Sequence, residues 1–336
     1  MRTTLEARLA TGNVLLADGA TGTNYFQMGL EAGEPPELWN VDHPERVQQL
    51  HRAFVDAGAD IILTNTFGGN RLRLQLHHAE DRALELNQRA AELAREVADA
   101  APRPVVVAGS VGPTGELFVP LGALTEEDAI AAFTEQITGL AAGGADVVWI
   151  ETMSAPEEIR AAARAAIAVG IPYAATGSFD TAGRTMMGLH PSGFAEVFAG
   201  LEPQPLAFGA NCGVGASDIL VTLLAMGERR NHVRLISKGN CGVPQFHGDE
   251  IVYSGSPALM AEYARLAVDA GAAIVGGCCG TSPEHLQAMR AALDTHAASA
   301  APSIEQIVEH IGPLANSMPE TLAAQSARGR ERRRSR

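Results

Sequence analysis

Short apolar runs and longer amphipathic stretches alternate eight times along this chain of 336 residues. Each apolar run is bounded by Gly, Asn, Asp or Ser, which is typical of parallel strands that are buried on both faces. The expected strands are Val14–Ala17, Asp60–Thr64, Val105–Gly109, Val147–Glu151, Tyr173–Gly177, Ala207–Asn211, Leu235–Lys238 and Ala273–Gly277. The expected helices are Pro44–Ala57, Asp81–Asp99, Glu126–Ala142, Ala155–Val169, Pro191–Gly200, Ala216–Met226, Pro257–Ala270 and Pro283–His296.

A (β/α)8 TIM barrel is the simplest closure of this strict alternation, and it is the fold we predict. A doubly wound open sheet is the structural alternative. The Gly-rich turn Asp18–Thr23 follows the first strand, but its glycine spacing does not fit a dinucleotide-binding loop. We expect residues 1–298 to form the barrel.

The character of the chain changes after residue 298. We expect residues 299–336 to form a C-terminal extension with a short helix at Ile304–Ile311. The extension ends in a basic run, Arg328–Arg336, which we interpret as a solvated tail. Contact with an acidic partner protein or with nucleic-acid phosphate is the alternative reading of that run.

The overall charge narrows the choice of partners. The net charge is −14 at pH 7, which disfavours binding to nucleic acid or to an anionic membrane. The N-terminus lacks the apolar core of a signal peptide, and no apolar run approaches the roughly 18 residues that span a bilayer. We therefore expect a soluble cytoplasmic protein, with no nucleic-acid or membrane partner, that could form a homo-oligomer.

All four cysteines are expected at one rim of the barrel. Cys212 follows the sixth strand, Cys241 the seventh, and Cys278 and Cys279 the eighth. Three thiolates make a soft site suited to Zn²⁺, and three protein ligands leave an open, catalytic position on the metal. Buried cysteines are also common core residues, but two successive strand residues cannot both face the core. We therefore predict Cys212, Cys278 and Cys279 as catalytic zinc ligands and Cys241 as a core residue. A residue that lines the pocket or a redox-sensitive neighbour of the site is the alternative role for Cys241.

An open zinc–thiolate site is better suited to holding a substrate thiol as a thiolate than to generating hydroxide. That sulfur could attack an electrophilic methyl group. Carboxylates on the rim could bind a substrate ammonium group, and backbone N–H groups a substrate carboxylate, so an amino-acid thiol such as homocysteine fits. The predicted substrate contacts are Asp18, Ala20, Thr21, Ser110, Glu151 and Asn211. A structural salt bridge is the alternative role for Glu151, and a turn cap for Asp18.

Six segments spread along the barrel resemble the homocysteine S-methyltransferase family. They are Ala17–Thr23, Ala59–Phe67, Gly109–Thr114, Ile150–Thr152, Asn211–Gly213 and Gly276–Thr281. The resemblance implies a (β/α)8 barrel, zinc on the cysteine trio and homocysteine as methyl acceptor. A zinc enzyme of another class, such as a lyase or hydrolase, and a non-catalytic binding subunit are the competing readings. The complete cysteine trio disfavours a non-catalytic binding subunit, and the lack of His ligands beside the trio disfavours a hydrolase.

The resemblance leaves four methyl donors open: betaine, S-methylmethionine, adenosylmethionine, or methylcobalamin on a partner module. The betaine-type pattern needs aromatic residues where this chain has Gly68 and Thr152, and Trp39 and Tyr25 align poorly with such a cage. Thr64–Asn70 is instead similar to the homocysteine module of cobalamin-dependent methionine synthase. We therefore expect a split methionine-synthase-type subunit that uses corrinoid and folate partner proteins, with betaine and the two sulfonium donors as alternatives.

Overall fold

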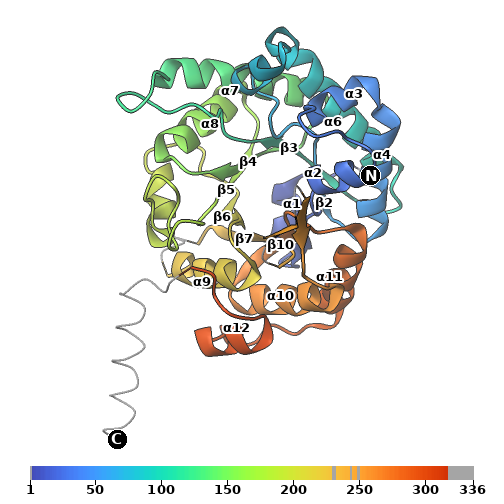
Figure 1. Cartoon of the computed structure of the whole chain (residues 1–336), viewed down its shortest axis with the longest axis vertical. Coiled ribbons are helices and arrows are strands. Elements are labelled where there is room, and N and C mark those ends of the chain that lie inside the picture. Colours follow the sequence, from blue (N-terminus) through green and yellow to red (C-terminus); the bar gives the residue numbers. More distant parts are fainter. Residues whose placement is uncertain (1, 229–231, 243, 248–249, 317–336) are drawn as a thin grey trace, which may run out of the picture.

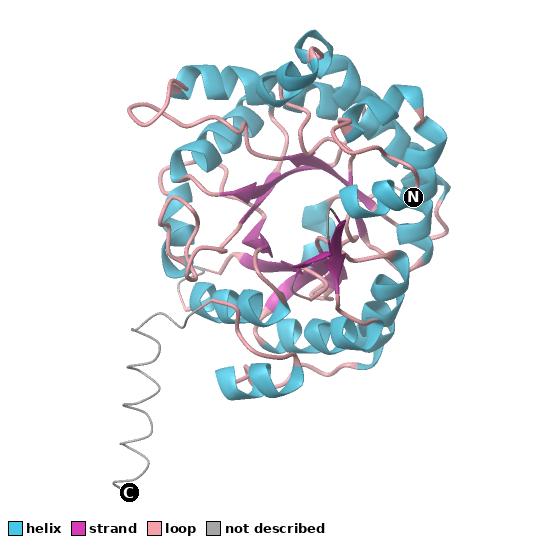
Figure 2. Ribbon diagram, in the orientation of Figure 1, coloured by secondary structure: helices cyan, strands magenta, loops and turns pink. Residues whose placement is uncertain are grey.

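The structure, a computed structural model, describes residues 2–228, 232–242, 244–247 and 250–316. Eight parallel strands form a ring surrounded by helices (Figures 1 and 2), in the order β1-β10-β7-β6-β5-β4-β3-β2. A parallel bridge between Ala17 and Ile61 joins β1 to β2 and closes the ring. The strands are β1 Leu15–Leu16, β2 Ile61–Leu63, β3 Val106–Val111, β4 Val147–Met153, β5 Tyr173–Gly177, β6 Ala207–Cys212, β7 Arg234–Gly239 and β10 Ala272–Gly277. The predicted (β/α)8 barrel is confirmed.

Strand residues alternate between the barrel interior and the layer of helices. Val147 and Trp149 belong to the interior cluster, whereas Val148 and Ile150 belong to the cluster that contacts the helices. All four are fully buried. Successive side chains of a strand point to opposite faces of the sheet, and in this barrel apolar residues cover both faces. This explains why the strands read as continuous apolar runs.

Seven of the eight expected helices are present within a few residues of their predicted bounds. They are α4 Pro44–Asp56, α6 Ala83–Ala100, α7 Glu126–Ala142, α8 Pro156–Val169, α9 Ala216–Gly227, α10 Pro257–Asp269 and α11 Pro283–Thr295. The eighth expected helix, Pro191–Gly200, is present as η4 (Pro191–Phe198), which is a 3-10 helix rather than an α-helix. Three of its four buried residues, Pro191, Phe194 and Val197, are spaced by three, which aligns them on one face of a helix with three residues per turn.

The sequence did not indicate several short elements. They are α1 Leu5–Ala10, α2 Gly22–Gln27, η1 Pro36–Leu38, α3 Trp39–Asp42, α5 Arg71–Leu74, η2 Gln75–His77, η3 Glu80–Arg82 and the antiparallel pair β8 Pro244–His247 and β9 Glu250–Tyr253. Leu5 and Leu9 of α1 are buried in the same cluster as the side chains of the barrel interior. The helix thus supplies part of the apolar core of the barrel.

The C-terminal extension contains α12, Ile304–His310, as predicted. Ile307 is fully buried, and the Ser217 hydroxyl donates to the Gly312 carbonyl oxygen at 2.8 Å. Asp218 accepts hydrogen bonds from the backbone N–H groups of the two residues at positions 315 and 316. The extension thus begins by packing on α9. Its separation from the barrel as a domain stays a prediction, and the basic run Arg328–Arg336 lies outside the described residues.

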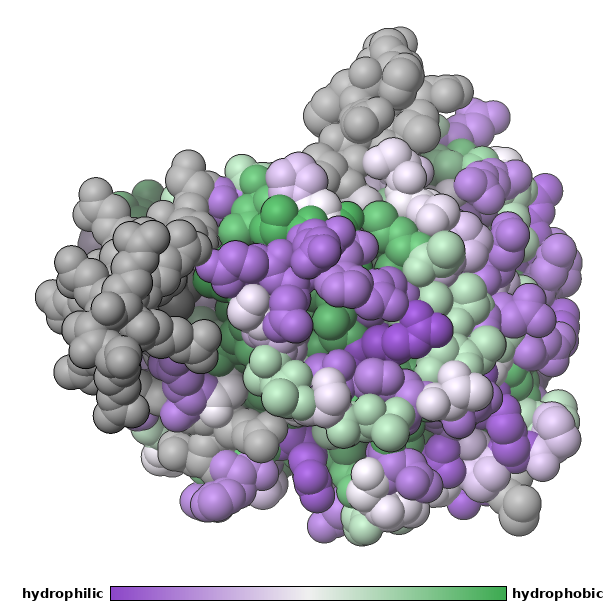
Figure 3. Space-filling model, turned by 90° about the horizontal axis from the view of Figure 1, so that it is seen from below, coloured by the Kyte–Doolittle hydropathy of each residue, from purple (hydrophilic) through white to green (hydrophobic). Residues whose placement is uncertain are grey.

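Polar and apolar residues are mixed on the side that carries α10 and α12 (Figure 3). Within the part of the chain that the structure describes, no helix combines the length and apolar character that crossing a membrane requires.

Gly209 in β6 leaves no room for a side chain against the neighbouring strand β7. A Cβ atom at this position would overlap the carbonyl oxygen of Ile236 in β7. We expect Gly209→Ala to lower the free energy of unfolding by about 3 kcal/mol, because backbone in a closed barrel cannot move aside. Gly227→Ala is the control, since a Cβ atom there has its nearest neighbour at 3.8 Å. Urea unfolding that gives equal stability for the two variants would contradict the expectation.

Candidate active site

Three cysteines meet at the ends of two strands. Cys212 ends β6, and Cys278 and Cys279 follow directly after β10. Their three sulfur atoms lie within 4.8 Å of one another, and the Cys212 and Cys279 sulfurs are 3.7 Å apart. Cys212 has a φ of 61°, a left-handed conformation that is uncommon outside glycine. The structure therefore brings together the trio that the sequence predicted.

The donor set fits a soft metal ion. Four ligands placed tetrahedrally at a Zn–S distance of about 2.3 Å would be separated by about 3.8 Å, close to the separation of Cys212 and Cys279. Hydrogen bonds from the Cys212 and Cys278 thiols lower the pKa of the Cys279 thiol, whereas hydrogen bonding to Cys278 and Cys279 raises the pKa of Cys212. The thiols alone therefore stabilise one thiolate, and a bound cation would stabilise the others. The trio could hold a metal ion.

Asn240 joins the two cysteine loops. Its side-chain oxygen accepts from the Cys279 N–H at 3.0 Å, and its side-chain nitrogen donates to the Gly213 carbonyl oxygen at 2.8 Å. Both partners are backbone groups next to or within the trio, so Asn240 fixes the two loops relative to each other.

The thiol of Cys241 is not part of the trio, although its backbone N–H donates to the Cys279 carbonyl oxygen at 2.9 Å. Its side chain is fully buried, and its thiol donates to the Gly255 carbonyl oxygen at 3.2 Å. Burial raises the pKa of Cys241 to about 11, which keeps the thiol protonated. The predicted role of Cys241 as a core residue is confirmed.

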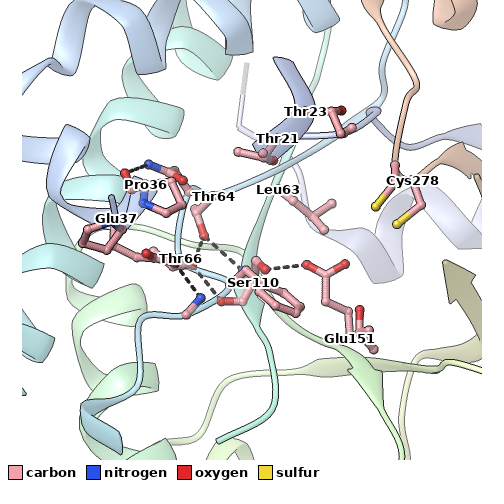
Figure 4. Close-up of a pocket in the computed structure, with 18 of the residues that line it drawn as sticks. Thr21, Thr23, Pro36, Glu37, Leu63, Thr64, Thr66, Ser110, Glu151 and Cys278 are labelled. Carbon is pink, nitrogen blue, oxygen red and sulfur yellow. Dashed lines mark hydrogen bonds between the residues drawn. The ribbon is translucent and has the colours of Figure 1, made fainter. Parts of the chain in front are cut away.

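Glu151 faces the same cavity as the trio. It lies near the end of β4, is 8% exposed, and accepts a hydrogen bond from the Ser110 hydroxyl at 2.5 Å (Figure 4). Burial raises the pKa of Glu151 to about 7. The carboxylate has no salt-bridge partner among the described residues. The alternative role of Glu151, a structural salt bridge, therefore receives no support.

Ser110 is itself held by two threonines at the end of β2. The Thr66 hydroxyl donates to the Ser110 carbonyl oxygen at 2.7 Å, and the Ser110 N–H donates to the Thr64 hydroxyl oxygen at 3.0 Å. The two threonine hydroxyls are 2.6 Å apart, and Thr64 must donate because the Thr66 hydrogen is already used. The chain of hydrogen bonds orients Ser110 toward Glu151 (Figure 4).

A buried ion pair lies between the trio and Glu151. The Lys238 ammonium group in β7 is 3.0 Å from one oxygen of Asp18, and the other oxygen accepts from the Leu63 N–H at 2.7 Å. Burial alone would lower the pKa of Lys238, but the charges of Asp18 and Glu151 raise it overall, so the amine stays charged. Sequence reasoning missed Lys238. The signal was a lysine at the end of an apolar strand, where an unpaired charge would be costly.

Several predicted substrate contacts are already used within the protein. The Ala20 N–H donates to the Thr281 carbonyl oxygen and the Ser110 N–H to the Thr64 hydroxyl oxygen, so both N–H groups have partners within the protein. Both residues line the cavity, and their contacts with substrate stay predictions. The carboxylate of Asp18 already pairs with Lys238 and accepts a hydrogen bond from the Leu63 N–H. Thr21 lines the cavity near Cys278 (Figure 4), and its contact with substrate stays a prediction.

Asn211 is also fully engaged. Its oxygen accepts from the Thr152 N–H at 2.9 Å and the Thr176 hydroxyl at 2.7 Å. Its nitrogen donates to the Thr152 hydroxyl at 2.8 Å and to the Cys278 sulfur at 3.8 Å. These four interactions fill the hydrogen-bonding capacity of an amide side chain. The predicted contact of Asn211 with substrate stays a prediction.

One cavity of about 500 Å³ connects the trio to the surface of the barrel. Its inner part is lined by the trio, Glu151 and Lys238, and its outer part includes Phe26 and Phe67, which are 55% and 41% exposed. Tyr25 and Trp39 are buried against each other, with ring centroids 5.2 Å apart, and do not line the cavity. These two aromatic rings therefore do not form a cage for a quaternary ammonium group.

Comparison with known proteins gives one family. A family model described as homocysteine S-methyltransferase matches residues 15–293. The methionine synthases of Mycobacterium leprae (strain TN) and Mycobacterium tuberculosis (strain ATCC 25618 / H37Rv) are each 32% identical to this chain, over 308 and 300 residues. Each alignment covers 83% of this chain and 24% of the relative, so the chain spans about a quarter of the length of these relatives.

Solved structures agree with the fold. The oxidized form of the homocysteine methyltransferase MmuM from Escherichia coli is 26% identical, with a TM-score of 0.71, and the match covers 85% of this chain and 98% of that one. The metallated form of the same protein is 24% identical with the same TM-score, covering 85% and 99%. A methyltransferase from Methanosarcina mazei shares the fold at 16% identity and a TM-score of 0.53, covering 87% and 98%.

Proposed function

The chain belongs to the homocysteine S-methyltransferase family, and from this we propose that it methylates homocysteine with a zinc ion held by Cys212, Cys278 and Cys279. It is a methyltransferase, and methionine would be the product. The observation that carries the proposal is the shared cavity, in which three thiols suited to a soft cation lie beside the Glu151 carboxylate. When bound, zinc would lower the pKa of the substrate thiol and keep its sulfur nucleophilic at neutral pH.

The residues of the chain supply the binding of the amino acid. Glu151 is the better placed of the two predicted carboxylates for the substrate ammonium group, because Asp18 already pairs with Lys238. An ammonium group beside Glu151 would favour its ionised form and oppose the effect of burial. The buried Ser110–Thr64–Thr66 network holds the carboxylate in one orientation before substrate arrives.

We further propose a methyl-corrinoid carried by a partner protein as the donor. The mycobacterial relatives that this chain matches over about a quarter of their length are methionine synthases, which supports a donor of the methionine-synthase type. Gly68 and Thr152 stand where a betaine cage needs aromatic side chains, and Trp39 and Tyr25 are buried away from the cavity. These observations disfavour betaine.

The test is methionine formation by the purified full chain with zinc and homocysteine. Betaine, S-methylmethionine, adenosylmethionine, free methylcobalamin and a methylated corrinoid protein are offered separately. We expect turnover with methylcobalamin or the corrinoid protein only. Turnover with betaine or a sulfonium compound would overturn the proposed donor. Failure with every donor, together with zinc retained by Cys278→Ser, would overturn the site.

Glu151→Gln should raise the KM for homocysteine by about 10- to 100-fold, because a hydrogen bond to a charged group contributes about 1.5–3 kcal/mol. The effect on kcat should be smaller, and the zinc content should not change. Ser110→Ala is the matched control, since it removes one donor to Glu151 but keeps the carboxylate. A KM that Glu151→Gln leaves unchanged would show that another group binds the ammonium.

A further inference from the structure

Asn211 connects two parts of the site that lie on different strands. It is 1% exposed, and its four hydrogen bonds reach Thr152 in β4, Thr176 in β5 and Cys278 after β10. Two of the four hold Thr152, one through its backbone N–H and one through its hydroxyl. A buried amide with every donor and acceptor used has one fixed orientation.

Thr152 occupies an unusual conformation next to Glu151. Its φ is 62°, which is a marked outlier for a β-branched residue. The pairing of β4 with β5 shifts register at this place: Ile150 pairs with Ala175 and Met153 with Gly177, so β4 has one extra residue. Such a bulge redirects the side chains of the bulged strand. Here Glu151 lies within the bulge, and its carboxylate points at Ser110 in the cavity.

The other end of the amide reaches the trio. The Asn211 nitrogen is 3.8 Å from the Cys278 sulfur, in a geometry that allows an N–H···S hydrogen bond. Groups that hydrogen-bond to metal ligands orient those ligands and tune the affinity for the metal. The same side chain therefore contacts a cysteine of the proposed metal site and the bulge of β4 that carries Glu151.

We propose that Asn211 is a positioning residue with two effects. By holding Thr152 in its left-handed conformation, it aims Glu151 at the substrate. Through its amide N–H, it orients Cys278. The inference rests on the proposed function in one respect, because it takes Glu151 as the group that binds the ammonium of homocysteine. The effect of Asn211 on the Thr152 backbone and on metal affinity does not depend on that assignment.

Asn211→Ala tests both effects. Without the amide, Thr152 should leave the left-handed region, and the KM for homocysteine should rise at least tenfold while kcat changes less. Zinc affinity, measured without substrate by competition with a chelator, should fall about 10-fold or more. Thr176→Val removes one hydrogen bond to the Asn211 oxygen but leaves Thr152 held, so its effects on KM and on zinc affinity should be smaller.

The double variant Asn211→Ala/Thr152→Gly separates the two effects. Glycine adopts positive φ without steric strain, so the bulge should form without the amide and the KM should return to within a few-fold of wild type. Zinc affinity should stay weak, because the N–H···S hydrogen bond is still missing. The double variant also serves where Asn211→Ala alone does not fold, since glycine removes the strain that the amide offsets.

Three results would overturn the inference. The first is an unchanged KM in Asn211→Ala, the second is a double variant whose KM is no better than that of Asn211→Ala, and the third is wild-type zinc affinity in both. If the wild-type protein forms no methionine with any donor, the proposed function fails. The crystal structure of metal-free Asn211→Ala and its zinc affinity then still decide whether Asn211 positions Thr152 and Cys278.

Discussion

Cys278→Ser should lose bound zinc and form methionine at least about a thousandfold more slowly than the wild-type protein. A metal ion that activates a nucleophile stabilises the transition state by several kcal/mol, and about 4 kcal/mol corresponds to a thousandfold change in the reaction rate. Cys278 is partly buried next to Cys212 and Cys279, so a hydroxyl in its place puts a poorer ligand into a soft site. Elemental analysis of the purified protein and the methionine assay measure the two effects.

Cys241→Ser is the control for this substitution. It makes the same chemical change in a cysteine whose thiol lies in the core and donates to the Gly255 carbonyl oxygen, and it leaves the backbone hydrogen bond from Cys241 to the Cys279 carbonyl oxygen in place. We expect it to keep its zinc and to retain activity within a few-fold. Equal zinc loss in both variants would mean that the trio is not the metal site. Retained zinc with lost activity in Cys278→Ser would mean that the cysteine has a role other than holding the metal.

Lys238→Met should lower the free energy of unfolding by about 3–5 kcal/mol. The Lys238 and Asp18 side chains are 3% and 2% exposed, and removing one partner of a buried ion pair leaves the other charge without compensation. Asp18 also lies near Glu151, so the remaining site would hold two buried carboxylates and no counter-charge. Urea denaturation of the metal-free proteins measures the change without the contribution of zinc.

Adding Asp18→Asn to Lys238→Met provides the decisive comparison. The double variant Lys238→Met/Asp18→Asn has no unpaired charge at this position and should recover most of the lost stability. Arg82→Met removes a partner from the exposed pair with Glu85, and we expect a change below about 1 kcal/mol. A double variant as unstable as Lys238→Met would show that packing of the lysine stem, rather than its charge, matters.

Local patterns in the sequence were sufficient for the barrel and for the meeting of the cysteines. Apolar runs of strand length predict parallel strands wherever they occur, and closure in sequence order then places the ends of β6 and β10 at the same rim. Cys212 and Cys278 could therefore be brought together without any tertiary information. The prediction of Cys241 as a core residue followed from a different argument, that three thiolates already complete an open zinc site.

Other parts of the site depend on contacts across the barrel that no local pattern reveals. The sequence gives no sign that Asp18 pairs with Lys238, because the two residues lie 220 positions apart and their meeting depends on the register of β1, β10 and β7. The N–H group of Ala20 looked free for the same reason, since its acceptor belongs to Thr281. The 3-10 geometry of η4 was missed because apolar spacing of three suits either kind of helix over so few residues.

The ligands of the proposed metal site are far apart along the chain. Cys212 ends β6, whereas Cys278 and Cys279 follow β10, and Asn240 after β7 ties their loops together. The unfolded chain cannot offer such a preformed site, so metal binding and closure of the last third of the barrel are thermodynamically linked. During synthesis the site would be completed only after β10 has been made and paired. Metal depletion would therefore reduce the population of folded protein as well as the rate of catalysis.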